Sequence, residues 1–297
     1  MNSICDDIRT RGPLVSDGGW GTLLIAAGLQ PSECPEEWNW SHPELVSDIA
    51  RQYFDAGADI VTTNSFGGSR FKLAHYHLQS RVAELNARAA ELSRLAAGPN
   101  RHVMASIGPT GKILMMGDVT EEEIYDAFRE QLVALEKGGA DACCIETMTA
   151  IDEAALAVRA AKENTALEII CTFTYERKLD DTYRTMMGVS PAEMAHAVIA
   201  EGASIVGTNC SHGPAAMVEI VAALHQASPD VPILVQPNAG APIQSDSGIG
   251  YLETPESMAA FVQSFLQAGA SIIGGCCGTT PQHIAAIARA LQDLRSK

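Results

Sequence analysis

Two adjacent cysteines end an apolar run in the segment ASIIGGCCGTTPQHI, at 270–284. Such a pair, Cys276 and Cys277, could form a vicinal disulfide, hold a metal ion, or be two small core residues. A vicinal disulfide requires a distorted peptide and an oxidising compartment, so it is the least favoured of the three. A third thiol, Cys210 in VGTNC, ends another apolar run. Three thiolates suit tetrahedral Zn²⁺ and leave a fourth position open for a substrate.

The residues around the cysteine pair favour the metal interpretation. Gly274 and Gly275 are predicted to let the backbone bend, so that two neighbouring side chains point at one ion; in a regular strand they would point to opposite faces. A second adjacent pair, Cys143–Cys144, stands inside an apolar run without glycines. We therefore interpret that pair, together with Cys171 in IICTF, as core residues.

Two carboxylates end other apolar runs. Asp17 follows PLVS, where a simple turn residue is the alternative interpretation. Glu146 follows ACCI, where a structural ion pair is the alternative. Two acids beside a thiolate–metal centre would suit the ammonium group of an amino-acid substrate.

The elements that must position these residues repeat along the chain. Eight apolar runs predict buried strands, and amphipathic segments such as PELVSDIARQYF and EEEIYDAFREQLVALEK predict helices between them. The runs lie within 13–18, 54–66, 102–109, 136–148, 167–175, 199–210, 231–240 and 266–278. Strict alternation predicts a parallel sheet, and eight units predict a (β/α)₈ TIM barrel formed as a single domain by residues 1–297. A doubly wound open sheet is the alternative, weakened by the lack of a GxGxxG motif after the first strand. In such barrels, chemistry occurs at the C-terminal ends of the strands.

Local signals predict where several helices begin. The stretch from Ser41 to Glu44 resembles a capping box. Thr254 and Thr280 are predicted N-caps, because each precedes a proline at the first helical position. The position of His283 at a helix start favours a capping or surface role over that of a base.

Composition excludes several classes of function. Thirty-six acidic and twenty basic side chains give a net charge of −16, which disfavours binding to nucleic acid and to anionic membrane surfaces. No uninterrupted apolar stretch approaches the length of a membrane span, and the first residues lack the apolar core of a secretory signal. We therefore expect a cytoplasmic protein with reduced thiols.

Seven motifs together resemble one family, the homocysteine S-methyltransferases, which includes betaine–homocysteine methyltransferase and the homocysteine domain of cobalamin-dependent methionine synthase. They occur in the family's order: DGGWGT, GADIVTTNSF, SIGPTGK, DACCIETM, VGTNCSHGP, QPNAGAP and GGCCGTTPQHI. The resemblance implies zinc ligation by Cys210, Cys276 and Cys277, binding of the homocysteine amino group by Asp17 and Glu146, backbone amides of Gly18 and Gly19 near its carboxylate, and orientation of the substrate site by Asn209.

The resemblance also implies a reaction. Homocysteine bound to zinc would lose its thiol proton, and its sulfur would attack a methyl group to give methionine. Family members take the methyl group from betaine, S-methylmethionine, other sulfonium compounds or methylcobalamin. Betaine enzymes carry an aromatic residue where this chain has Gly67, so a betaine cage is not expected. The stretches SIGPTGKILMMGDVTEEE and PNAGAP resemble the homocysteine half of methionine synthase. If the donor of this chain is methylcobalamin, a separate corrinoid protein is expected to deliver it.

The sequence allows two roles for the three tryptophans and two alternative functions for the chain. Trp20, Trp38 and Trp40 could form a cage for a cationic donor or simply pack against the barrel. The chain could instead be a corrinoid-linked methyltransferase with another thiol acceptor, or a non-catalytic zinc barrel that serves as a partner subunit. Asp17 and Glu146 argue against the last, because structural zinc needs neither acid.

Overall fold

The computed structural model describes residues 2–245 and 248–296, and its core is an eight-stranded parallel sheet. The strands of this sheet are hydrogen-bonded in the order β1-β12-β9-β8-β5-β4-β3-β2. Each strand therefore pairs with the barrel strand that precedes or follows it along the chain. A parallel bridge between Ser16 and Ile60 joins the two end strands and closes the barrel. The strands are β1 (Leu14–Val15), β2 (Ile60–Thr62), β3 (His102–Ile107), β4 (Ala142–Met148), β5 (Glu168–Phe173), β8 (Ile205–Asn209), β9 (Ile233–Gln236) and β12 (Ile272–Ile273). The predicted TIM barrel is therefore confirmed.

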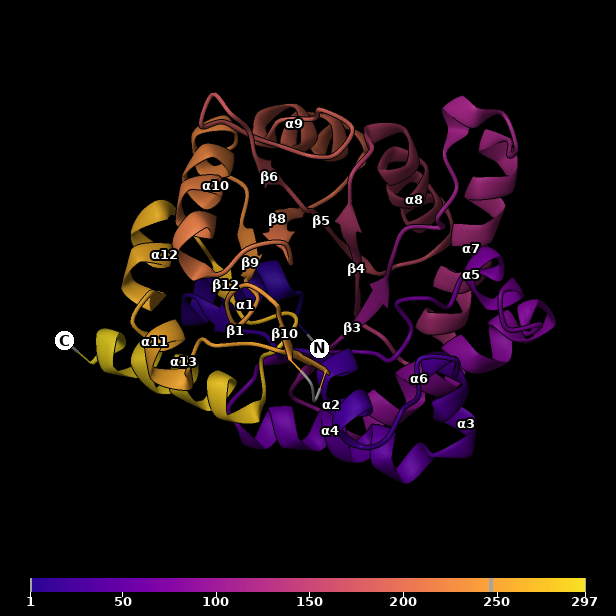
Figure 1. Ribbon diagram of the computed structural model, residues 1–297, viewed down its shortest axis with the longest axis horizontal. Helices are drawn as coiled ribbons and strands as arrows, with labels where there is room; N and C mark the ends of the chain where they lie inside the picture. Colours follow the sequence, from indigo (N-terminus) through magenta and orange to yellow (C-terminus); the bar gives the residue numbers. More distant parts are fainter. Residues whose placement is uncertain (1, 246–247, 297) are drawn as a thin grey trace.

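Helices surround the strands on the outside, as Figure 1 shows. The outer helices are α4 (Pro43–Asp55), α6 (Val82–Ala97), α7 (Glu121–Lys137), α8 (Ile151–Asn164), α9 (Pro191–Glu201), α10 (Pro214–Ala227), α12 (Val262–Ala268) and α13 (Pro281–Arg295). Shorter helices are α1 (Ile4–Arg11), α2 (Trp20–Ala26), α3 (Trp38–Ser41), α5 (Arg70–Ala74) and α11 (Pro255–Ala259). Two hairpins, β6 (Glu176–Arg177) with β7 (Tyr183–Arg184) and β10 (Ile243–Ser245) with β11 (Gly248–Gly250), extend loops that follow β5 and β9.

The helix-start predictions have mixed outcomes. Thr254 caps α11 by accepting from the amide of Ser257, and Thr280 caps α13 in a capping box with His283. The predicted capping box at Ser41 is wrong: Ser41 is the last residue of α3, and α4 begins at Pro43 after a His42 N-cap without a side-chain hydrogen bond. The three-residue spacing is present, but the serine belongs to the preceding helical turn.

The inside of the barrel has two layers of different polarity. Alternate strand residues point inward, and those nearest the N-terminal ends form an apolar cluster. Its members are Leu14, Ile60, Met104, Ala142, Cys144, Ile170, Ile205, Leu234 and Ile272. One step further along the strands, the inward positions become polar: Thr62, Ser106, Glu146, Thr172, Asn209 and Gln236. The polar layer is therefore at the end where barrel enzymes place their chemistry.

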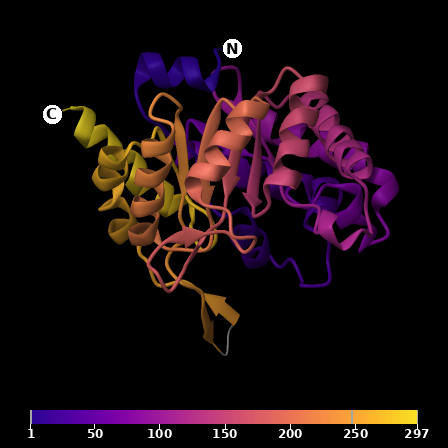
Figure 2. The same ribbon diagram turned by 90° about the horizontal axis from the view of Figure 1, so that it is seen from above.

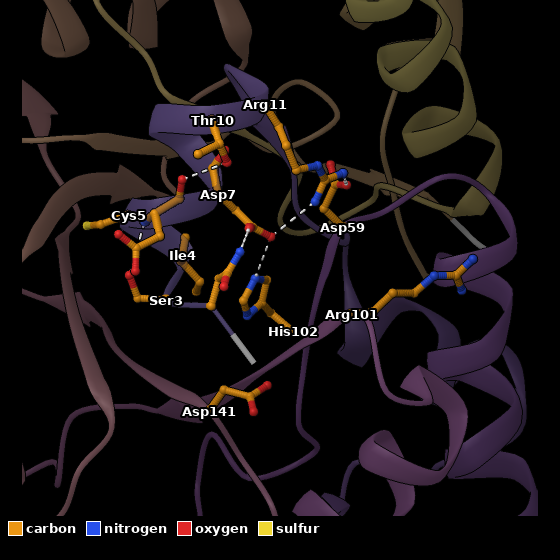
Figure 3. Close-up of polar contacts among 12 residues, drawn as sticks. Ser3, Ile4, Cys5, Asp7, Thr10, Arg11, Asp59, Arg101, His102 and Asp141 are labelled. Atoms are coloured by element: carbon orange, nitrogen blue, oxygen red, sulfur yellow. Dashed lines mark hydrogen bonds and ion pairs between the residues drawn. The ribbon is translucent and has the colours of Figure 1, made fainter.

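Helix α1 covers the opposite end of the barrel, away from the β10–β11 hairpin (Figure 2). The side chain of Ile4 is fully buried in the apolar layer. The first two amides of the helix donate to Glu168 at 2.5 and 3.0 Å. Asp7 lies 3.1 Å from Nε2 of the buried His102 and also pairs with Arg11 (Figure 3). Helix α1 thus closes the apolar core at the N-terminal ends of the barrel strands.

Among the described residues, no helix is both long and apolar enough to cross a membrane.

Candidate metal and substrate site

The three predicted metal-binding cysteines lie together at the polar end of the barrel. Cys210 follows β8 directly, and Cys276 and Cys277 follow β12 after two glycines. Their sulfur atoms all lie within 4.8 Å of one another, and the Cys210 and Cys277 sulfurs are 3.9 Å apart. All three are partly buried. By contrast, the other adjacent pair, Cys143–Cys144, is fully buried on β4, as expected for core residues.

The two glycines before the cysteine pair are explained by close packing rather than by the predicted hinge. Neither Gly274 nor Gly275 has a positive φ; a side chain at the first would overlap Ser16, and one at the second would overlap Thr279. These glycines are required for close approach. The left-handed residue in the sulfur cluster is Cys210 itself, at φ 61°, a conformation that is unusual for a residue other than glycine.

The pKa values of the three thiols differ because their sulfurs interact with one another. The interaction of the three sulfurs lowers the pKa of Cys210 and raises the pKa values of Cys276 and Cys277. Three sulfurs this close cannot all be ionised without a counter-charge. A divalent, thiophilic cation supplies that charge, and the donor set fits zinc.

Asp17 contributes a buried carboxylate with one free oxygen. Its Oδ2 accepts from the Thr62 amide and hydroxyl, both at 2.7 Å, and from Trp20 Nε1 at 2.8 Å. Its Oδ1 is buried and has no hydrogen-bond partner. Burial raises the pKa of this carboxyl to about 6, although its donors act in the opposite direction. A buried oxygen left without a donor is costly, so Oδ1 is suited to accept from a ligand.

Glu146 contributes the second carboxylate, at the end of β4. It accepts from Ser106 Oγ at 2.5 Å and from Asn209 Nδ2 at 3.4 Å. Burial raises its pKa to about 7; the Ser106 hydrogen bond opposes this, and the charges of Asp17 and Cys210 raise it further. Because the charge of Asp17 helps to raise the pKa of Glu146, the two carboxylates interact, and a cation bound between them would be favoured.

Asn209 connects the carboxylate side of the site to the sulfur side. Its fully buried amide accepts from Thr172 Oγ1 at 2.8 Å and from the Thr147 amide at 2.9 Å. Its Nδ2 donates to Thr147 Oγ1 at 2.8 Å and lies 4.0 Å from the Cys276 sulfur. With every polar atom occupied, Asn209 is an orienting residue rather than a direct contact for a ligand.

The two predicted glycine amides differ. The Gly19 amide donates to Thr279 Oγ1 at 3.0 Å, and the Gly19 carbonyl accepts from the Tyr53 hydroxyl. The Gly19 amide is therefore already engaged, which leaves Gly18 as the candidate to bind a substrate carboxylate. A side chain at Gly18 would overlap Thr279.

The tryptophans are dispersed. Trp20 is hydrogen-bonded to Asp17, whereas Trp38 is buried and stacked on His42 with ring centroids 4.3 Å apart. Trp40 is 58% exposed and lines a hollow of about 950 Å³ between α6 and α7 on the outside of the barrel. The three indoles therefore do not assemble into a cage.

Two residues near the sulfurs were not selected from the sequence. Asn238 Oδ1 accepts from the Cys277 amide at 3.1 Å, and Asn238 stood in the sequence only as one polar residue after a strand. The Tyr251 ring, in the segment that follows β11, packs against Gly278, the residue after the cysteine pair. Nothing in the spacing of the sequence connects Tyr251 to a cysteine 26 positions later.

The fold and the site together describe a (β/α)₈ barrel with a cluster of three thiols that could hold a metal ion and two acids at the ends of its strands. The chain belongs to the homocysteine S-methyltransferase family, whose sequence profile matches residues 14–291.

Similar proteins agree with this assignment. The chain is 32% identical to methionine synthase of Mycobacterium tuberculosis over 97% of its own length, and 32% identical to that of Mycobacterium leprae over 94%. It spans 25% and 24% of those proteins, about a quarter of their length. The homocysteine methyltransferase MmuM from Escherichia coli shares the fold: its metallated form has a TM-score of 0.78 at 22% identity, covering 97% of this chain and 99% of that one.

Proposed function

We propose that the protein transfers a methyl group to the sulfur of homocysteine, giving methionine, at a zinc ion held by Cys210, Cys276 and Cys277. The observation that carries this proposal is the convergence of three sulfurs within 4.8 Å at the polar end of the barrel, together with the buried carboxylate of Asp17 and the partly buried one of Glu146. Zinc bound there would keep a substrate thiol deprotonated at neutral pH.

The residues of the chain have separate tasks in this proposal. Asp17 Oδ1 and Glu146 bind the substrate ammonium group, and the Gly18 amide binds its carboxylate. Asn209 fixes Glu146 relative to the Cys276 side of the cluster. Held at its polar end, the substrate presents its sulfur to the methyl donor in a fixed direction. The new bond joins this sulfur to the methyl carbon, and the bond to the donor breaks with its electron pair remaining on the donor.

The free oxygen of Asp17 distinguishes this function from a purely structural zinc site. A structural site needs closed ligation and no unpaired buried carboxylate oxygen nearby. Here Oδ1 of Asp17 is buried without a partner, while Oδ2 has three donors. Oδ1 of Asp17 would gain a hydrogen-bond donor when a cationic group binds beside it.

For the methyl donor, we infer that a separate corrinoid protein presents methylcobalamin at the barrel mouth. The tryptophans do not form a cage for a sulfonium or quaternary ammonium donor, which disfavours S-methylmethionine and similar small cations. Large exposed apolar side chains lie instead on loops that follow β2, β3, β5 and β9: Phe66, Ile113, Met115, Met116, Leu179, Met186, Met187, Ile243 and Leu252. Exposed apolar groups concentrated around one opening are typical of a protein-binding face, and methionine adapts well to such contacts.

A donor panel tests both parts of the proposal. Zinc-loaded protein is incubated with homocysteine and, separately, S-methylmethionine, betaine, dimethylsulfoniopropionate, methyltetrahydrofolate, free methylcobalamin and a methylated corrinoid protein, and methionine is measured. We expect methionine from the methylcobalamin arms, with the protein-bound form faster. Zinc content with no homocysteine affinity would refute the function, and turnover confined to S-methylmethionine would refute the inferred donor.

A further inference from the structure

Strand β4 carries a bulge near its end. Between Ile145 and Met148 its register with β5 shifts, so that Glu146 and Thr147 together face a single residue of β5. Ile145 and Met148 are both fully buried in the core cluster that joins the strands to the outer helices, although an uninterrupted strand would place residues three apart on opposite faces. The bulge therefore lets Glu146 point into the barrel and returns the apolar Met148 to the outer core.

The bulge depends on a backbone conformation that threonine rarely adopts. Thr147 has a φ of 61°, in the left-handed region, where a β-branched side chain is a steric outlier. Such a conformation persists only where surrounding contacts enforce it, and outliers of this kind cluster at functional sites. Glycine would adopt the same φ without strain, so we expect the threonine side chain to have a task of its own.

Asn209 holds Thr147 at two points. Its Oδ1 accepts from the Thr147 amide at 2.9 Å, and its Nδ2 donates to the Thr147 hydroxyl at 2.8 Å. The same Oδ1 accepts from Thr172 Oγ1 at 2.8 Å, and the same Nδ2 lies 3.4 Å from Glu146 Oε2. One side-chain amide on β8 thus reaches across β5 to β4, the three strands that lie side by side in the barrel (Figure 1).

We propose that Thr147 is a positioning residue that fixes the direction of the Glu146 carboxylate, so that the site selects thiols that carry an ammonium group. Both residues belong to one bulge, and the left-handed turn at Thr147 sets the direction of the backbone that follows Glu146. The Thr147 hydroxyl also accepts the shorter hydrogen bond of Asn209 Nδ2, which leaves Glu146 Oε2 with a contact of 3.4 Å only. That oxygen is therefore able to accept a strong hydrogen bond from a ligand ammonium group. This inference rests on the proposed function, because it names what selects the substrate at that site.

The test measures ligand selectivity rather than turnover. Zinc-loaded proteins are titrated calorimetrically with homocysteine and with its desamino analogue, which keeps the thiol and the carboxylate and lacks only the amino group. Zinc content is measured in the same samples. Wild type should bind homocysteine more tightly than the analogue. Thr147→Val keeps the branched shape and removes the hydroxyl, so it should lower this preference about fivefold, the size expected for one lost hydrogen bond, by weakening homocysteine alone.

Three further variants separate positioning from a general loss of structure. Thr147→Ser keeps the hydroxyl and should restore the preference for homocysteine. Thr147→Gly removes the hydroxyl and the steric strain together, so it should unfold at no lower urea concentration than Thr147→Val and still lose the preference. Thr165→Val is the matched control: it removes a threonine hydroxyl that donates to the Ala161 carbonyl at 2.7 Å at the end of α8, and it should keep the preference.

Two results would overturn the proposal. One is an unchanged preference in Thr147→Val and Thr147→Gly at full zinc content. The other is an equal loss of affinity for both ligands, because that would assign Thr147 to the general stability of the barrel. If Thr147→Val does not fold, Thr147→Gly decides by the same two results. Failure of the proposed function is recognised separately in wild type, as zinc binding without affinity for homocysteine.

Discussion

Replacing Glu146 by glutamine is expected to weaken homocysteine binding by about 30- to 150-fold without loss of zinc. Two opposite unit charges about 4 Å apart attract by about 4 kcal/mol at an effective dielectric constant near 20. Glu146 is partly exposed, so solvent reduces this to about 2–3 kcal/mol, which corresponds to the stated range in affinity. Zinc should remain, because Glu146 reaches the sulfur cluster only through Asn209.

The assay is isothermal titration of homocysteine into zinc-loaded protein at pH 8, with zinc measured in the same samples. Glu122→Gln, which removes an exposed acid from α7, is the control for net charge and should bind like wild type. Ser106→Ala removes the 2.5 Å hydrogen bond to Glu146 and should give a smaller loss in the same direction. A change below about threefold in Glu146→Gln, at full zinc content, would refute the assignment of Glu146 to the ammonium group.

Four further predictions concern pH dependence, metal content and stability. Homocysteine affinity should fall as pH is lowered from about 8 to 6 in isothermal titrations, because burial raises the pKa of Glu146 to about 7 and that of Asp17 to about 6, and a protonated carboxyl does not attract an ammonium ion. The same raised values mean that the ligand-free fold loses stability as pH rises from about 4 through 7, which urea titrations at several pH values would detect. Cys210→Ser should lose most bound zinc by elemental analysis, whereas Cys143→Ser should keep zinc but unfold at lower urea. Ile4→Ala should lower the unfolding free energy by about 2–4 kcal/mol, since it empties a fully buried position, and leave zinc content unchanged.

The barrel and its cysteine cluster were predictable because their signals are periodic or local. Each apolar run ends at a strand end, and parallel strands bring their ends to one side of a barrel. That geometry alone places Cys210 near Cys276 and Cys277 from separate elements, and Asp17 near Glu146. The contrast with Cys143–Cys144 was also local, because that pair has apolar neighbours on both sides.

Other features depend on contacts that sequence spacing does not encode. The glycines before Cys276 were interpreted as a hinge, yet their necessity comes from Ser16 and Thr279, which approach from the far end of the chain. Helix α1 has local signals in its sequence, namely Ser3 as N-cap and acids in its first turn. Its place under the barrel depends on Glu168, more than 150 positions away. The contact of the Tyr251 ring with Gly278 likewise exists only in the folded chain.

Backbone strain gathers where the sulfur and carboxylate halves of the site meet. The described non-glycine residues with positive φ are His77, Thr147, Asp181, Cys210 and Ser211. Two of them, Thr147 and Cys210, hydrogen-bond Asn209 or adjoin it in sequence, and each costs about 1–3 kcal/mol. Such conformations persist only where surrounding contacts enforce them: Asn209 makes two hydrogen bonds to Thr147, and the Cys210 amide donates to Gln236 at 3.1 Å. The position of the Cys210 sulfur is therefore set by the register of β8 on β9 and by Asn209, which means that the folded barrel itself orients this sulfur toward the cysteines of the last strand.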